Sequence, residues 1–241
     1  MIVIPAFNEA ESIGKVVAEV QQYVSEAIIV VDDSSTDGTA TRAEAAGAVV
    51  LRLPFQLGAW GATQAGLRYA LRQDWPVAIT LDADGQHAPS DLGRLLHPVV
   101  SDAADVAIGA YPERASTLRR VAQRYFRGFG GLALEDLTSG FRAYNQRAIE
   151  QLARPFATLL DYQDVGVLLN LKHHGFRVVE VPVRMRDRRH GHSRIFNSWW
   201  AVSRYMVQTS VLCLAQVGRR IDCSSQLPEG EQRDSESVEC R

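Results

Sequence analysis

Two carboxylates, Asp82 and Asp84, stand two residues apart directly after the apolar run 77–81. At this spacing on a turn they can share a hard divalent cation, which prefers oxygen ligands and keeps coordination positions for substrate phosphates. Gln86 adds an amide oxygen two residues further on. An isolated Asp-x-Asp pair is more often a solvated turn before a helix, so the metal interpretation depends on the residues that accompany it.

A second acidic cluster, which includes Asp33 and Asp37, follows the apolar run 27–31. A carboxylate here could accept the N–H of a nucleobase, or it could cap the helix that follows. The pair Asn8-Glu9 ends another apolar run, where it could border the same site or simply begin a helix. The residues alone leave these alternatives open.

Apolar runs that alternate with helical periodicity make up the first half of the chain. Predicted strands cover 2–4, 27–31, 49–51, 77–81 and 106–109, and predicted helices cover 9–23, 40–46 and 61–71. Continuous apolar strands separated by helices indicate an α/β fold, Rossmann-like, with a mostly parallel sheet and helices on both faces. Ligands in such sheets bind at the carboxyl ends of the strands, and all three polar clusters fall there.

The second half of the chain has a different pattern. Residues 114–127 contain five arginines and no acid, and a turn at 138–142 follows. An arginine run is ordinarily a solvated face, but the guanidinium fork also suits phosphate recognition. A helix over 163–174 and a strand over 178–183 are predicted next. No linker divides residues 1–197, which we therefore expect to form one domain.

Composition excludes several classes of protein. With 241 residues, 46% of them hydrophobic, and a formal net charge of −2, the chain is neither disordered nor a general nucleic-acid binder. Three cysteines without C-x-x-C spacing argue against a disulfide-built core and favour a reducing compartment. No export signal is evident at the N-terminus, so we expect a cytoplasmic protein.

The C-terminal part is predicted to contact a membrane without crossing it. Residues 199–217 are apolar but include Arg204 and Gln208, which favours an amphipathic, interfacial helix over 198–221. Phe196, Trp199 and Trp200 would contribute to peripheral contact. The stretch 222–241 has the composition of a disordered acidic tail.

Five motifs, taken together and in order, carry a family resemblance. They are Ile4-Pro-Ala-Phe-Asn-Glu9, Val31-Asp-Asp-Ser-Ser-Thr-Asp-Gly-Thr39, Leu81-Asp-Ala-Asp-Gly-Gln-His87, Asp136-x-Thr-Ser-Gly-Phe-Arg142 and Arg188-x-x-Gly191-x-Ser193-Arg194. This set resembles the family 2 glycosyltransferases of the dolichyl- and polyprenyl-phosphate mannose synthase branch. The resemblance spans residues 1 to about 197.

The resemblance implies a GT-A fold and an inverting transfer of a hexose from a GDP- or UDP-sugar to a polyprenyl or dolichyl phosphate. It further implies that Asp84 and Gln86, with Asp82, hold Mg²⁺ or Mn²⁺ on the diphosphate. The nucleotide-sugar pocket would be lined by Pro5, Ala6, Asn8, Glu9, Asp33, Asp37, Asp82 and Asp84. The acceptor phosphate would be bound by Arg119, Arg120, Arg124, Arg127, Ser139 and Arg142. Arg188, as a catalytic residue, and Arg194, which could also reach the acceptor phosphate, would close over the diphosphate.

The acceptor is the less determined half of this expectation. A phosphate monoester is already an anionic nucleophile and needs mainly positioning, whereas a sugar hydroxyl needs a general base. The residues near the start of the predicted helix at 163 offer Asp164 or Asp161 as that base. A hydroxyl acceptor is thus one alternative, and a non-catalytic nucleotide-sugar binding protein is another. Trp60 could flank the sugar or pack in the interior.

A nucleotidyltransferase is disfavoured. Such enzymes commonly carry a glycine-rich phosphate loop soon after the first strand, and residues 5–9 contain no glycine.

Overall fold

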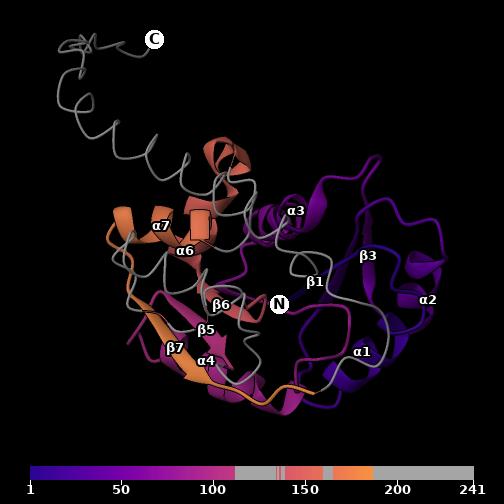
Figure 1. Cartoon of the computed structure of the whole chain (residues 1–241), viewed down its shortest axis with the longest axis horizontal. Helices are drawn as coiled ribbons and strands as arrows, with labels where there is room; N and C mark the ends of the chain where they lie inside the picture. The colour runs from indigo at the N-terminus through magenta and orange to yellow at the C-terminus, as the bar shows by residue number, and fades with distance from the viewer. Residues whose placement is uncertain (112–133, 135, 137–138, 160–164, 187–241) are drawn as a thin grey trace, which may run out of the picture.

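A computed structural model of the chain describes residues 1–111, 134, 136, 139–159 and 165–186 (Figure 1). The strands of these residues form one sheet in the order β3-β2-β1-β4-β6-β5-β7. The strands are β1 (Ile2–Ala6), β2 (Ile28–Asp32), β3 (Val49–Arg52), β4 (Val77–Thr80), β5 (Val106–Ala110), β6 (Arg142–Asn145) and β7 (Val178–Pro182). The α-helices are α1 (Ile13–Val20), α2 (Thr39–Ala45), α3 (Gly58–Arg72), α4 (Leu92–Val100), α6 (Gln146–Ala153) and α7 (Val165–His173).

The sheet is mostly parallel, as the sequence predicts. Strands β3, β2, β1 and β4 pair in parallel, and so do β5 and β7. Strand β6 lies between β4 and β5 and is antiparallel to both. The carboxyl ends of β1, β2 and β4 therefore lie next to one another. Because β6 is antiparallel to β4, it begins at that same edge, and residues 139–141 lie beside the end of β4.

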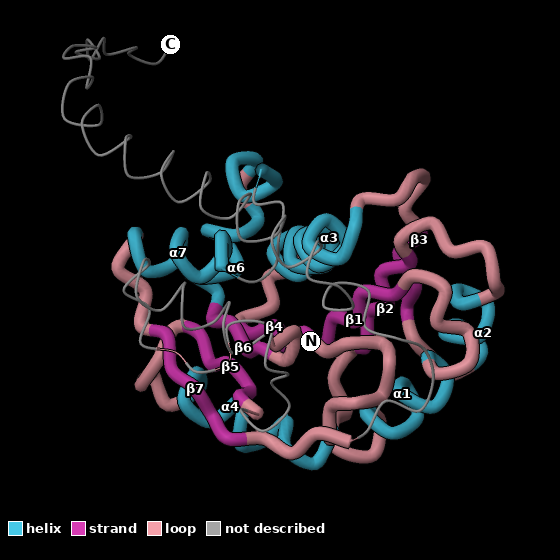
Figure 2. The backbone as a smooth tube through the Cα atoms, viewed as in Figure 1, coloured by secondary structure: helices cyan, strands magenta, loops and turns pink. Residues whose placement is uncertain are grey.

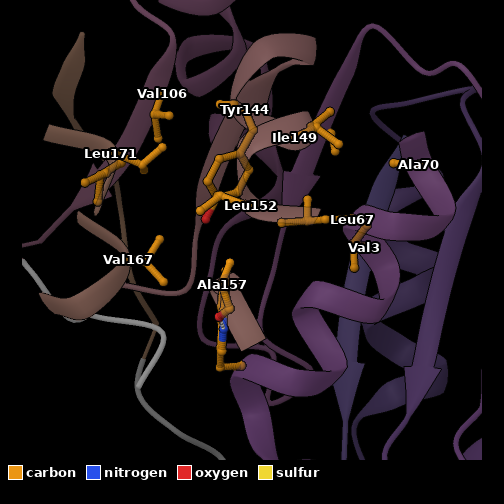
Figure 3. Close-up of a cluster of buried hydrophobic side chains, with 14 of the residues drawn as sticks. Val3, Leu67, Ala70, Val106, Tyr144, Ile149, Leu152, Ala157, Val167 and Leu171 are labelled. Atoms are coloured by element: carbon orange, nitrogen blue, oxygen red, sulfur yellow. Dashed lines mark hydrogen bonds between the residues drawn. The ribbon is translucent and has the colours of Figure 1, made fainter. Parts of the chain in front are cut away.

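Helices cover both faces of the sheet (Figures 1 and 2). Alternate residues of β1 divide between the two cores, because successive side chains of a strand point to opposite faces. Val3 belongs to the core under α3, α6 and α7, where it lies near Leu67 and Ala70 of α3 (Figure 3). Ile2 and Ile4 belong to the core formed with α1, α2 and α4.

The main errors of the sequence prediction lie in the short elements. Strand β6 and helix α6 are not predicted, because four residues that begin with an arginine give little strand signal and the helix follows without a loop. The helix start is nevertheless marked, since Asn145 caps α6 by accepting a hydrogen bond from the Ala148 N–H at 2.9 Å. Helix α4 is anticipated only as the helix that could follow the Asp82–Asp84 turn, and α1 begins at Ile13 rather than at residue 9.

The predicted interfacial helix over 198–221 and the acidic tail over 222–241 lie outside the described residues. Within the described part of the chain, no helix combines the length and the apolar character that crossing a membrane requires.

Candidate active site

The loops that follow β1 and β2 are joined to each other by hydrogen bonds. The Asn8 N–H donates to Ser35 Oγ, and Asn8 Oδ1 accepts from the Thr36 N–H, both at 2.9 Å. Asn8 and Ser34 have φ angles of 54° and 65°, in the left-handed region that turns the chain sharply. The two loops therefore form one preformed wall at the carboxyl edge of the sheet.

Asp37 links this wall to the start of α2. Its carboxylate accepts hydrogen bonds from the Ala10 N–H at 3.0 Å and from the Thr39 N–H at 3.1 Å, and it also accepts from the Thr39 hydroxyl. Desolvation alone would raise the pKa of Asp37, but the hydrogen bonds from Thr39 and Ala10 together outweigh it, so that this pKa is lowered. Asp37 therefore stays ionised and stabilises the wall.

Asp33 holds the start of α3. The buried carboxylate accepts from the Leu57 N–H at 2.6 Å and from the Gly58 N–H at 2.9 Å. Both of its oxygens thus bind backbone amides at the first turn of a helix, where orphan N–H groups need acceptors. Asp33 thus acts as a cap, but of α3 rather than of the helix that directly follows the acidic cluster.

The turn after β4 carries Asp82, Asp84 and Gln86. Asp84 Oδ1 accepts from the Gln86 N–H at 3.0 Å, and Gly85 has a φ of 74°, which folds the turn back on itself. Both carboxylates are partly exposed, whereas Gln86 is buried. Two carboxylates and an amide supply oxygen donors for a hard cation and leave room for phosphate oxygens. Among the described residues no cluster of three or more His, Cys, Asp or Glu side chains forms a closed metal site.

Residues 183–186, which we call the strap, hold this turn from the other half of the chain. Met185 forms an antiparallel bridge with His87, and the Arg186 N–H donates to the Gln86 carbonyl at 2.8 Å. The strap leaves β7 and runs toward α1 (orange in Figure 1), where the Arg186 guanidinium reaches Glu19 at 2.6 Å. The Arg184 N–H donates to the fully buried Asp91 at 2.6 Å.

The turn that precedes β6 lies against Asp82. A Cβ atom at Gly140 would overlap the Asp82 carboxylate, so any other residue there would have to displace that side chain or the turn. Ser139 is buried, and its carbonyl accepts from Arg142 Nε at 2.8 Å. Two motifs far apart in the sequence therefore meet at one point of the sheet edge.

Comparison with known proteins assigns this arrangement to a family. The Glycosyl transferase family 2 sequence profile matches residues 1–157. The chain belongs to that family. The chain is 32% identical over 216 residues to the polyprenol monophosphomannose synthase of Mycolicibacterium smegmatis, covering 82% of this chain and 81% of that protein. It is 31% identical to the undecaprenyl-phosphate mannosyltransferase of Micrococcus luteus, over 81% and 86% of the two chains.

Solved structures confirm the fold of this family 2 glycosyltransferase. The glucosyl-3-phosphoglycerate synthase of Mycobacterium tuberculosis, crystallised with Mn²⁺, UDP and phosphoglyceric acid, superimposes with a TM-score of 0.70 at 21% identity. The match covers 88% of this chain and 77% of that one. The expected GT-A α/β fold is therefore correct. The two relatives named above confirm the resemblance to the polyprenyl-phosphate branch.

The structure brings the expected donor residues to one edge of the sheet. Pro5 and Ala6 end β1, and Asn8, Glu9, Asp33 and Asp37 form or support the wall beside the Asp82–Gln86 turn. Glu9 is anchored through its N–H, which donates to Thr39 Oγ1 at 2.8 Å.

Arg142 lies in the interior beside the site. It is fully buried in β6, and its Nε donates to the Ser139 carbonyl, so it braces the Ser139–Gly140 turn. Contact with the acceptor phosphate stays a prediction for this residue. The remaining predicted residues lie outside the described part of the chain. They are Arg119, Arg120, Arg124, Arg127, Asp161, Asp164, Arg188, Arg194, Phe196, Trp199 and Trp200.

Trp60 packs in the interior. It is 4% exposed, and its Nε1 donates to the Ala157 carbonyl at 2.7 Å. One and two turns along α3, Gln64 donates to the Leu152 carbonyl at 2.8 Å and Arg68 donates to the Ala153 carbonyl at 2.9 Å. This α3 stripe, Trp60, Gln64 and Arg68, holds the segment 152–158 against the helix.

His87 is the residue that sequence reasoning missed. It closes the Asp82–His87 motif, and its Nε2 lies 2.9 Å from Asp82 Oδ2. The only signal in the sequence is its place directly after Gln86, which does not distinguish a buried partner of Asp82 from a loop residue.

Proposed function

We propose that this family 2 glycosyltransferase transfers a hexose from a nucleoside diphosphate sugar to a polyprenyl phosphate, with inversion at the anomeric carbon. The observation that carries the proposal is the meeting of the Asp82–Gln86 turn with the Ser139–Gly140 turn at the carboxyl edge of the sheet. The two relatives named for polyprenyl-phosphate mannosyl chemistry, each matched over about four fifths of its length, support the acceptor.

The donor would bind across the wall and the turn. Asp84, Asp82 and Gln86 would hold Mg²⁺ or Mn²⁺ on the diphosphate. Such a cation, when bound, neutralises the negative charge that develops as the nucleoside diphosphate leaves. Hydrogen bonds of Asp37 and Asn8 already order the backbone of the wall, which would reduce the entropy lost when a nucleoside binds. UDP in the structurally similar synthase supports a uridine donor, and a guanosine donor is the alternative.

The acceptor would attack from the side of the Ser139–Gly140 turn. A phosphate oxygen of the lipid forms the new bond to the anomeric carbon while the bond from that carbon to the diphosphate oxygen breaks. This nucleophile is already anionic, so catalysis there consists mainly of positioning. Arg119, Arg124, Arg127 and Arg194 are the proposed ligands of the acceptor phosphate, because the guanidinium fork grips two oxygens at once. Arg188 would bind the diphosphate of the donor.

Because the proposed acceptor is a membrane lipid, the enzyme must work at a bilayer surface. We place it peripherally, on the cytoplasmic face, through the predicted amphipathic helix over 198–221.

The test is release of nucleoside diphosphate by the purified chain. GDP- and UDP-sugars are supplied with Mn²⁺ or Mg²⁺, each with and without a short polyprenyl phosphate in detergent. Release should require one donor, the cation and the lipid, and Asp84→Ala should lower it by about 1,000-fold. The matched control is Glu150→Ala, on the exposed face of α6, which should keep full activity. Donor binding without any stimulation by the lipid would overturn the acceptor assignment in favour of a hydroxyl acceptor.

A further inference from the structure

His87 is a buried imidazole at the edge of the donor site. Its side chain is 1% exposed, whereas the Asp82 side chain that it contacts is 38% exposed. The ring packs on Phe141, with 5.1 Å between the ring centroids, and the backbone is fixed by the bridge to Met185. The imidazole is therefore held by the interior on one side and faces Asp82 on the other.

The hydrogen-bonding roles of the two ring nitrogens are unequal. An ionised carboxylate only accepts hydrogen bonds, so Nε2 carries the hydrogen that is shared with Asp82 Oδ2. The other nitrogen, Nδ1, is buried and finds no partner among the described residues. An unsatisfied buried nitrogen destabilises the fold, and an apolar residue of similar size would fill this position better. What histidine supplies there, and an apolar residue cannot, is the N–H group directed at Asp82.

Asp82 is confined from a second direction. Gly140 lies so close that a Cβ atom would overlap the carboxylate. The carboxylate therefore sits between the backbone of the Ser139–Gly140 turn and the imidazole. A partly exposed aspartate has several accessible rotamers in the absence of such contacts.

We propose that His87 is a positioning residue that orients the Asp82 carboxylate through its Nε2–H. It does not touch the substrate. The inference rests on the proposed function, because the orientation matters only if Asp82 contributes to binding of a cation and a diphosphate. Partners that orient metal-binding carboxylates typically change metal affinity or activity by about 10- to 100-fold when they are removed.

The experiment compares two replacements of the same residue in the full chain. His87→Leu removes the N–H and also the unsatisfied Nδ1, whereas His87→Gln keeps an N–H donor at about the position of Nε2. Binding of Mn²⁺ is measured by the electron paramagnetic resonance signal of the free ion, with UDP or GDP present. We expect about 10- to 100-fold weaker Mn²⁺ binding in His87→Leu and recovery of most of it in His87→Gln. Thermal unfolding is followed in parallel.

The control is His97→Leu, the same replacement at an exposed position on α4, which should leave Mn²⁺ binding unchanged. Equal Mn²⁺ affinity in His87→Leu and wild type would overturn the inference. A parallel loss in His87→Leu and His87→Gln, together with a lower unfolding temperature in both, would assign His87 a structural role instead. If the wild-type chain bound no Mn²⁺ with either nucleotide, the proposed function itself would fail.

Discussion

The loops after β1 and β2 stabilise each other, whereas the turn after β4 is stabilised by residues from the second half of the chain. Asp37 and Asn8 form bonds that span 27 and 28 positions. Gln86, by contrast, meets Arg186, which lies 100 positions later in the sequence. The wall is thus a property of the first two βα units, and the turn requires the whole sheet.

This difference divides the proposed donor site into a part for the nucleoside and a part for the diphosphate. The part proposed to receive the nucleoside is complete once β1 and β2 pair. The part proposed to receive the diphosphate is complete only after β6 has inserted next to β4 and the strap has crossed to α1. Substitutions that destabilise the second half of the sheet should therefore weaken binding of the diphosphate more than binding of the nucleoside.

The strongest test of this division is Gly140→Ala. The added methyl group must displace the Asp82 carboxylate or the β6 turn, and misplacement by about 1 Å at a reacting centre can lower the rate by about 100-fold. We expect a loss of that size in the kcat/KM for nucleoside diphosphate release. Gly93→Ala in α4 is the control, because a Cβ there meets no atom within 4 Å. Unchanged kcat/KM in Gly140→Ala would show that the two turns are independent.

Asp33→Ala tests whether Asp33, in the wall, caps α3 or recognises the base of the nucleotide. The Leu57 and Gly58 amides would lose their acceptor in partly buried hydrogen bonds, which should lower the free energy of unfolding by about 1 to 3 kcal/mol. Urea unfolding measures this loss. The preference between UDP and GDP, measured by calorimetry, should be retained in the folded fraction if Asp33 acts as a cap. A reversal of that preference would instead assign Asp33 to base recognition.

Asp105→Asn tests the opposite edge of the sheet, where β5, β6 and β7 are joined. Asp105 is buried and accepts from the Arg177 N–H at 2.8 Å and from Asn145 Nδ2 at 2.9 Å. Desolvation would raise the pKa of Asp105, but the hydrogen bonds from Arg177 and Asn145 together lower it. We expect Asp105→Asn to cost about 1 to 2 kcal/mol of unfolding free energy at neutral pH.

The pH dependence of that cost follows from the lowered pKa. The contribution of Asp105 is complete above the unfolded-state pKa of about 3.9 and is lost as the pH falls through the lower folded-state value. The difference between wild type and Asp105→Asn should therefore be constant from about pH 5 to 7 and should shrink below about pH 4. A difference that instead grew below that pH would contradict the lowered pKa.

The smallest effect is expected for Arg186→Gln. The ion pair with Glu19 is partly exposed on both sides, at 42% and 36%, and such pairs contribute about 0.2 to 1 kcal/mol. The backbone bonds of the strap remain in this variant. Urea unfolding should show a loss within that range, and a much larger loss would mean that the side chain, rather than the backbone, secures the strap.

The sequence predicts the repeated βα units and the edge at which the site lies, because long apolar runs report burial on both faces of a parallel sheet. It does not predict β6, since Arg142 begins that strand and its burial depends on pairing with β4 and β5. Nor does it predict that Asp33 caps α3, because Leu57 is 24 positions away and only the folded chain brings them together. His87 escapes prediction for the same reason, since its burial depends on the strap and on Phe141.

The α3 stripe has a consequence for how sequences of this kind can diverge. Trp60, Gln64 and Arg68 bind main-chain carbonyls of the segment 152–158, which every amino acid provides. The exposed side chains at 154–156 can therefore be exchanged while these anchors persist, whereas Leu152 and Ala157 pack in the core and the Thr158 hydroxyl bonds to Gln64. The stretch that leads toward Asp161 and Asp164 is thereby attached to the scaffold through bonds that are largely indifferent to its sequence.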